Sequence, residues 1–178
     1  AGKRAFSVVF SPDEHSSFAG FGATKNHFFI NVLEDVKNRI YLVKPGADIW
    51  ERSALAHMPQ FGTVSLSAVD DEESDDFFMT ISDYLTPTSL YLGTVGGSEP
   101  QLLKQLPAFF DAKELQVAQN FATSKDGTKV PYFLIARKNL SMDGANPTLL
   151  YGYGGFEISM LPGYNASAGR GWLSEGGV

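Results

Sequence analysis

The residues best suited to chemistry lie in a glycine-rich hexapeptide at positions 151–156 (YGYGGF). It continues the apolar stretch 148–151, with which it shares Tyr151 and which we expect to form a short buried strand. Glycine lets the backbone turn sharply and pass close to a ligand at the end of such a strand. In acyl-transfer enzymes, loops of this kind donate hydrogen bonds to the developing oxyanion. A tyrosine hydroxyl in this segment can be such a donor, and the alternative is a tyrosine that packs beside a turn.

Composition excludes several other kinds of site. The sequence has no cysteine, which excludes disulfides, thiolate zinc sites and a cysteine nucleophile. The acidic run 70–76 lacks the glycine and the spaced glutamate of a calcium loop, so we interpret it as a solvated loop. No cluster of Lys and Arg could neutralise nucleic-acid phosphates, and no apolar run approaches the roughly 20 residues that cross a bilayer. We expect no metal, no cofactor, no nucleic-acid partner and no membrane partner.

The elements that must position the hexapeptide are mainly strands. Short runs rich in β-branched and aromatic residues are separated by turn residues, and several of them alternate apolar and polar positions. The predicted strands are 5–10, 27–33, 39–43, 77–81, 89–92, 115–121 and 130–136. This pattern predicts a mainly β protein with antiparallel sheets over the first two thirds of the chain.

An internal repeat refines this prediction. Residues 26–43 (NHFFINVLEDVKNRIYLV) align with 75–93 (DDFFMTISDYLTPTSLYLG) at an offset of 49 or 50 residues. A period of this length that contains several strands is typical of β-propeller blades, which are four-stranded sheets. We therefore expect a partial β-propeller of about two blades. The alternative is a chance similarity between two hairpins.

The composition changes towards the end of the chain, where 144–178 holds nine of the eighteen glycines. Something other than a further blade is expected there. Before it, the segment 124–128 (SKDGT) predicts a hairpin through an Asp-Gly turn. After the hexapeptide, Asn165 is a candidate N-cap for a helix over about 166–174, which Gly169 and Gly171 weaken.

Two motifs together resemble a known family. The segment 149–156 (LLYGYGGF), preceded by 120–131 (NFATSKDGTKVP), is similar to the start of the peptidase domain in the prolyl oligopeptidase family. The segments 109–111 (FFD) and 85–91 (LTPTSLY) resemble the last propeller blades of that family. The resemblance covers nearly the whole chain and is weakest over 1–17.

The resemblance implies a two-part serine peptidase that cleaves short peptides after proline. It assigns 1–113 to the C-terminal blades of a β-propeller and 114–178 to the first strands of an α/β-hydrolase domain. Tyr153 matches the tyrosine that contributes to the oxyanion hole. Phe156 matches an aromatic residue of the proline-binding S1 pocket. Gly152, Gly154 and Gly155 would shape the turn.

The resemblance also implies that the catalytic triad lies beyond Val178. No G-x-S-x-G motif occurs, since the nearest match, 96–100 (GGSEP), ends in proline. In α/β-hydrolases the triad histidine comes last, whereas His15, His27 and His57 all precede Tyr153. We therefore expect an internal piece of a larger enzyme that is inactive alone and self-associates.

We expect a cytoplasmic protein, with the periplasm as the alternative compartment. A second hypothesis also stays open at this point. The chain could be a β-rich interaction module with no enzymatic parent.

Overall fold

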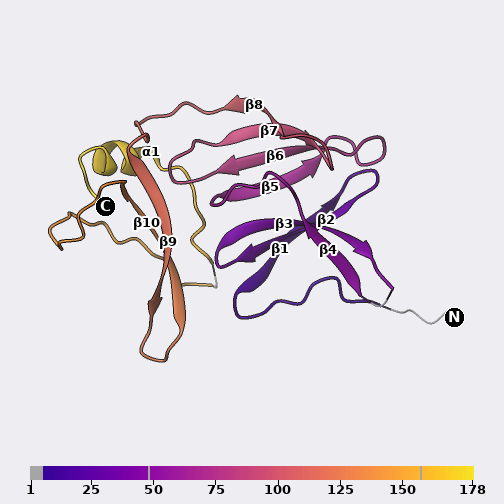
Figure 1. Ribbon diagram of the computed structural model, residues 1–178, viewed down its shortest axis with the longest axis horizontal. Helices are drawn as coiled ribbons and strands as arrows, with labels where there is room; N and C mark the ends of the chain where they lie inside the picture. Colours follow the sequence, from indigo (N-terminus) through magenta and orange to yellow (C-terminus); the bar gives the residue numbers. More distant parts are fainter. Residues whose placement is uncertain (1–5, 48, 157) are drawn as a thin grey trace.

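The computed structural model describes residues 6–47, 49–156 and 158–178, and antiparallel strands dominate it. The first four-stranded sheet contains β1 (Ser16–Ala23), β2 (Phe28–Glu34), β3 (Lys37–Pro45) and β4 (Trp50–Ala54). The second contains β5 (Thr63–Ala68), β6 (Asp76–Ser82), β7 (Ser89–Thr94) and β8 (Gln101–Gln105). A hairpin of β9 (Leu115–Thr123) and β10 (Lys129–Arg137) follows, and then α1 (Ala166–Ala168), which continues as a π-helical turn (Gly169–Leu173). Figure 1 shows the two sheets stacked on one side and the hairpin crossing beside them.

The repeat predicted from the sequence is confirmed as two sheets of the same topology. In each sheet the strands pair in chain order as an antiparallel meander. The strands of the second sheet start 47, 48, 52 and 51 residues after their counterparts in the first. The number of propeller blades stays a prediction.

Each sheet places a phenylalanine of its second strand over a glycine of a neighbouring strand. A Cβ atom at Gly22 would lie 2.4 Å from the ring of Phe29, and one at Gly93 would lie 2.6 Å from the ring of Phe77. Both rings are buried. Glycine is required at these two positions because any side chain would collide with the ring.

The main core lies between the two sheets. It is an apolar cluster to which both sheets contribute, and it consists of Phe29, Ile40, Leu55, Val64, Phe77 and Met79. Ile30, Val32 and Val43 form a second cluster on the opposite face of the first sheet, together with Val9, Phe10 and Trp50. Because the first sheet buries apolar residues on both faces, it requires a covering layer on each side.

An amide pair, of which Asn38 is buried and Asn31 partly buried, joins β5 to the first sheet. Asn31 donates through Nδ2 to the carbonyl of Val64 at 2.9 Å, and Asn38 accepts from the Val64 amide at 3.1 Å. Asn38 also donates to Asn31 at 2.8 Å, so the two side chains satisfy each other. Paired polar groups at a partly buried site favour one arrangement, because any shift leaves a donor or acceptor unpaired.

Asp75, just before β6, ties the two sheets together at one end. It accepts hydrogen bonds at 2.8 Å from the Asn26 amide, the Asn26 side chain and the Thr24 hydroxyl. The Nδ1 atom of His27 lies 3.1 Å from the same carboxylate. These bonds, with those from Asn26 the strongest, hold the pKa of Asp75 well below its usual range.

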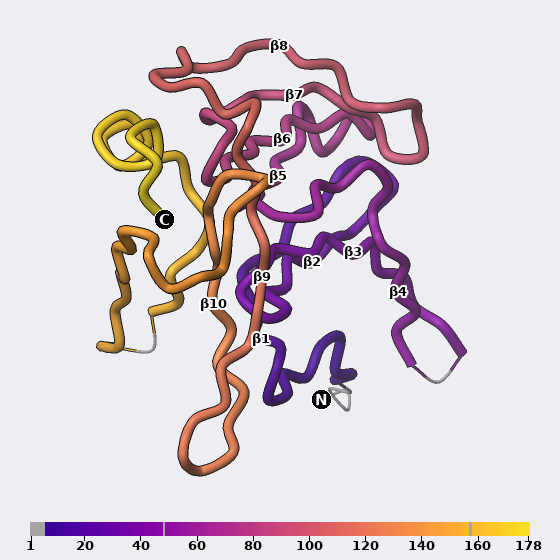
Figure 2. Tube along the Cα trace, turned by 60° about the vertical axis from the view of Figure 1, so that its left-hand side comes forward, coloured from indigo at the N-terminus to yellow at the C-terminus, as the bar shows by residue number. Residues whose placement is uncertain are grey.

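The hairpin β9–β10 and the C-terminal segment pack against the ends of the strands. Phe133 of β10 lies edge-on to Phe61 at 6.0 Å and tilted against Tyr84 at 5.3 Å, and burial raises the pKa of Tyr84 to about 12. Gln119 of β9 donates to the carbonyl of Asp35 in the β2–β3 turn at 2.6 Å. Figure 2 shows the hairpin running alongside both sheets.

Several predictions made from the sequence need correction. Residues 6–10 of the predicted strand 5–10 are not a strand, and Ala5 lies outside the described residues. Residues 148–151 are neither a strand nor buried, and Leu150 is 93% exposed. The first segment covers the face of the first sheet without pairing, and the second pairs at a single point only.

The remaining predicted strands, the Asp-Gly hairpin and the Asn165 cap are confirmed, although the helix is shorter and partly π-helical. The sequence analysis missed β1, β4, β5 and β8. Of these, β1 is rich in small residues (SSFAGFGA) and β8 is exposed throughout. The apolar signal that identifies a strand is therefore weak in both. By contrast, β5 (TVSLSA) alternates and was detectable.

Acid should weaken the hydrogen bonds that the Asp75 carboxylate accepts. Because the pKa of Asp75 is lower in the folded protein than in the unfolded chain, its stabilisation is complete above about pH 4. The stabilisation is lost as the pH falls from that value towards the folded pKa. We expect Asp75→Asn to lower the melting temperature at pH 7 and to reduce its dependence on pH below about 4. Asp71→Asn, an exposed position in the same loop, is the matched control. A melting profile of Asp75→Asn that equals the wild-type profile would refute this role.

Candidate functional site

The glycine-rich loop 151–156 leaves a segment that pairs with the end of the described chain. The amide of Leu149 donates to the carbonyl of Val178, and the amide of Val178 donates to the carbonyl of Pro147, both at 2.8 Å. Val178 thus bonds to the residues on either side of Thr148, which is the pattern of a parallel strand pair. The helical turn 166–173 lies between the two paired segments, as in a parallel crossover.

Tyr153 folds back over a glycine of its own loop. Its side chain is 51% exposed. A Cβ atom at Gly155 would lie 2.8 Å from the Tyr153 hydroxyl oxygen and 3.1 Å from its Cζ atom. At Gly152 and Gly154 an added Cβ would meet nothing within 4 Å. Among the three glycines of the loop, Gly155 is the one that leaves room for this hydroxyl.

Phe156 ends the loop in an unusual conformation. Its φ angle is 55°, in the left-handed region, and its side chain is 91% exposed. A bulky residue in this region costs about 1–3 kcal/mol, and such outliers concentrate at functional sites. Phe156 and Tyr153 thus both present exposed side chains from one loop.

The far side of the loop is held by residues that the sequence analysis did not identify. The Thr63 hydroxyl donates to the carbonyl of Pro162 at 2.6 Å, and the amide of Tyr164 donates to the Ser82 hydroxyl at 3.3 Å. Pro162 is fully buried. The partners are 99 and 82 positions apart, and no local pattern in the sequence links them.

His15 and His27 lie beside strands of the first sheet, in turns or loops. His15 lies 3.1 Å from the carboxylate of Asp35, and His27 lies 3.1 Å from that of Asp75. The carboxylate of Asp75 is shared with Thr24 and Asn26. These two histidines therefore connect turns of the chain through carboxylates.

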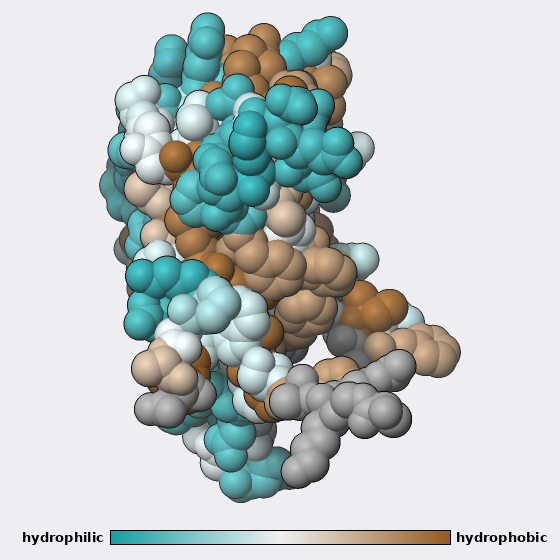
Figure 3. All heavy atoms as spheres, turned by 90° about the vertical axis from the view of Figure 1, so that its right-hand side faces the viewer, coloured by the Kyte–Doolittle hydropathy of each residue, from teal (hydrophilic) through white to brown (hydrophobic). Residues whose placement is uncertain are grey.

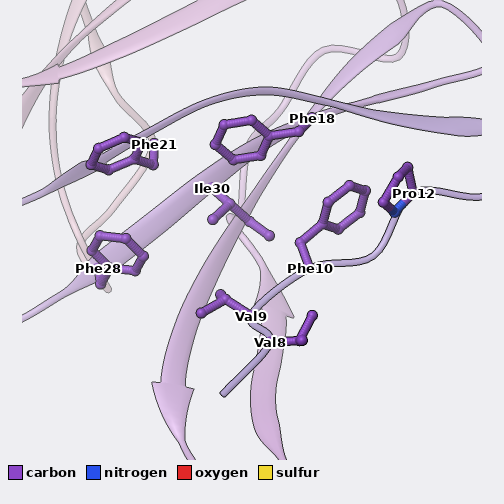
Figure 4. A pocket seen from close by; sticks show the side chains of 8 residues that line it. All are labelled: Val8, Val9, Phe10, Pro12, Phe18, Phe21, Phe28 and Ile30. Carbon is purple, nitrogen blue, oxygen red and sulfur yellow. The ribbon is translucent and has the colours of Figure 1, made fainter. Parts of the chain in front are cut away.

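An apolar hollow lies on the outer face of the first sheet. Its volume is about 440 Å³. Four phenylalanine rings line it, and each ring centroid lies 5.9–6.4 Å from the next in the order Phe10, Phe18, Phe21 and Phe28. Figure 4 shows these rings around Ile30. Figure 3 shows apolar side chains gathered in the middle of the face that lies on the right in Figure 1. A second hollow of about 400 Å³ lies between β1 and β5. Neither hollow includes a residue of the glycine-rich loop.

Residues 6–47, 49–156 and 158–178 are the part of the chain that the structure describes. In this part of the chain no helix combines the length and apolarity needed to cross a bilayer. The same described residues contain no group of three or more His, Cys, Asp or Glu side chains placed to hold a metal ion.

Comparison with known proteins agrees with the resemblance seen in the sequence. The model of the prolyl oligopeptidase N-terminal β-propeller domain matches residues 3–105, which is more than half of the chain. An uncharacterized peptidase from Sinorhizobium fredii is 44% identical over 171 residues, covering 96% of this chain and 23% of that protein. A prolyl endopeptidase from Elizabethkingia meningoseptica is 31% identical over 118 residues, covering 66% of this chain and 17% of that protein. The chain therefore spans less than a quarter of the length of these two relatives.

The fold agrees with solved structures as well. A post-proline cleaving enzyme from Rickettsia typhi has a TM-score of 0.77 and 28% identity, and the match covers 98% of this chain and 25% of that one. The mainly β architecture predicted from the sequence is thereby confirmed. Because the propeller model covers β1–β8 and the likeness extends over the rest of the described chain, this chain belongs to the prolyl oligopeptidase family.

Proposed function

We propose that this chain is a segment of a serine peptidase that hydrolyses short peptides after proline by acyl transfer. The observation that carries the proposal is the position of the glycine-rich loop. It leaves a segment paired in the parallel manner and presents Tyr153 and Phe156 to solvent. Family membership supports peptide substrates, because proteins similar to this chain include prolyl endopeptidases.

The proposed domain boundary lies between residues 113 and 114. Residues 1–113 would be the C-terminal blades of a propeller, and 114–178 would begin the α/β-hydrolase domain. The end of β8 at Gln105 and the start of a separate hairpin at Leu115 support this division. Val178 exchanges backbone hydrogen bonds with Pro147 and Leu149 in the parallel manner. This pairing supports a hydrolase-type sheet, because such sheets are built from parallel strands joined through helices.

Tyr153 would act on the tetrahedral intermediate of the reaction. When a serine attacks the scissile carbonyl, negative charge develops on the carbonyl oxygen. A hydroxyl held in advance at that point donates a hydrogen bond that is stronger in the transition state than in the substrate complex. Gly155 supports this role because it leaves room for the hydroxyl above the backbone.

Phe156 would line the pocket for the substrate proline. Proline is apolar and lacks an N–H group, so an aromatic wall can bind its ring without any polar partner. The exposure of Phe156 supports this role, since a core residue at the same position would be covered. Its left-handed backbone directs a bulky side chain out of the loop at an energetic cost, which supports a functional reason for the conformation.

The nucleophile, acid and histidine of the triad would be supplied by other parts of the parent enzyme. The chain alone would then be inactive. We expect a full-length enzyme with this sequence to hydrolyse a chromogenic Gly-Pro substrate, and a serine-directed phosphonate to abolish the activity. The isolated chain should show none. No activity in either protein would favour the interaction-module hypothesis, and activity in the isolated chain would contradict the assignment of the nucleophile.

Removing the Tyr153 hydroxyl tests its role directly. In the full-length enzyme we expect Tyr153→Phe to lower kcat about 100-fold or more with little change in KM, because loss of one oxyanion donor costs about 2.7–4 kcal/mol. Tyr151→Phe, an exposed tyrosine two positions earlier, is the matched control. Gly155→Ala should reduce kcat in the same direction by displacing the hydroxyl, whereas Gly152→Ala adds a methyl group into open space. An unchanged kcat/KM in Tyr153→Phe would rule out the oxyanion role.

The isolated chain would also self-associate. Every residue of the edge strand β8 is exposed, and Phe21 beside the apolar hollow is 70% exposed. Free strand edges and apolar patches promote pairing between chains. We expect light scattering at tens of micromolar to report a dimer or a larger species. A single monomeric species at that concentration would disprove this expectation.

A further inference from the structure

We propose that the second sheet positions the glycine-rich loop through two hydroxyl groups, those of Thr63 and Ser82. This inference rests on the proposed function of the loop in oxyanion binding. It assigns Thr63 and Ser82, which lie on the propeller side of the proposed domain boundary, as positioning residues for the peptidase reaction.

The two hydroxyls form one clamp. Thr63 begins β5, Ser82 ends β6, and the two residues are direct partners in the antiparallel register. Their partners on the C-terminal segment are the carbonyl of Pro162 and the amide of Tyr164, which are two residues apart. Thr63 donates and Ser82 accepts, so the pair matches the carbonyl acceptor and the amide donor of the segment.

The strands that carry the two hydroxyls pack in the core between the sheets. The neighbour of Thr63 on β5 is Val64, which is 2% exposed, and Ile81 beside Ser82 packs against the same core. Gly62 precedes Thr63 with a φ angle of +137°, and a Cβ there would lie 3.2 Å from the carbonyl of Ser82. Rigid strands hold a functional group more accurately than loops do. The positions of the two hydroxyls are therefore fixed by the core between the sheets.

Aromatic packing reinforces the clamp on its other side. The Tyr164 ring stacks on Phe110 at 5.0 Å with an interplanar angle of 5°, and its hydroxyl accepts from the amide of Phe109 at 2.7 Å. A Cβ at Gly169 would lie 2.0 Å from the Phe110 ring, so the helical turn closes directly over it. Tyr164 is therefore held by its backbone, its ring and its hydroxyl.

The clamp holds one end of the longer segment that contains the loop, at Pro162 and Tyr164. The other end is held by the pairing of Leu149 with Val178. Between these two points Leu150, Tyr151 and Phe156 are largely exposed and pack little against the core. The position of the Tyr153 hydroxyl therefore depends on its two supports, and a displacement of about 1 Å is enough to reduce a rate strongly.

The test uses Thr63→Val in the full-length enzyme, because valine keeps the shape of threonine and removes the donor. We expect kcat to fall roughly 10-fold with KM changed by less than about twofold. Affinity for a peptidyl prolinal aldehyde, whose hemiacetal oxygen mimics the oxyanion, should fall by about the same factor as kcat. Thr63→Ser, which keeps the hydroxyl, should restore both, and Ser82→Ala should reproduce the loss. Thr80→Val, on the same sheet, is the matched control.

Hydrogen–deuterium exchange gives a readout that does not need activity. We expect the amides of 151–156 to exchange faster in Thr63→Val than in wild type and to return to the wild-type rate in Thr63→Ser. If the wild-type enzyme fails to cleave after proline but exchange responds in this way, the proposed function falls and the clamp stands. Unchanged exchange, or a loss of kcat that Thr63→Ser does not restore, overturns the clamp.

Discussion

The packing of the two four-stranded sheets against each other is the constraint on which the rest of the structure depends. Each sheet is too small to bury its apolar face alone, so Phe29 and Ile40 from one side must meet Phe77 and Met79 from the other. Within each sheet, the buried phenylalanine ring requires glycine on the neighbouring strand, at positions 22 and 93. The core therefore sets both the spacing of the sheets and the residues that their strands tolerate.

Polar groups then decide how the sheets are aligned. Apolar packing is not directional, and it would tolerate small shifts of one sheet over the other. Asn31 and Asn38 remove this freedom at β5, and Asp75 removes it at the opposite end of the second sheet. Paired polar groups of this kind contribute modest stability and considerable specificity, because any other alignment leaves them without partners.

This alignment extends to the site. Thr63 and Ser82 lie at the ends of strands whose neighbouring residues belong to the core, and they hold the segment that follows the glycine-rich loop. The loop itself contributes exposed side chains and flexible glycines. In the proposed function the loop carries the functional side chains, and the second sheet holds the loop in position. Functional loops on rigid scaffolds are commonly arranged in this way.

The sequence by itself determined the mainly β architecture, the repeat, the hairpin at Asp126-Gly127 and the family, because each of these depends on periodicity or on residues close together in the chain. The tertiary structure decided that 148–151 is exposed and that β1 and β8 are strands. The sequences of β1 and β8 have little strand preference of their own, and hydrogen bonding to a neighbouring strand determines their conformation. The tertiary structure alone joined Thr63 to Pro162, because a hydrogen bond between residues 99 positions apart leaves no local pattern to read.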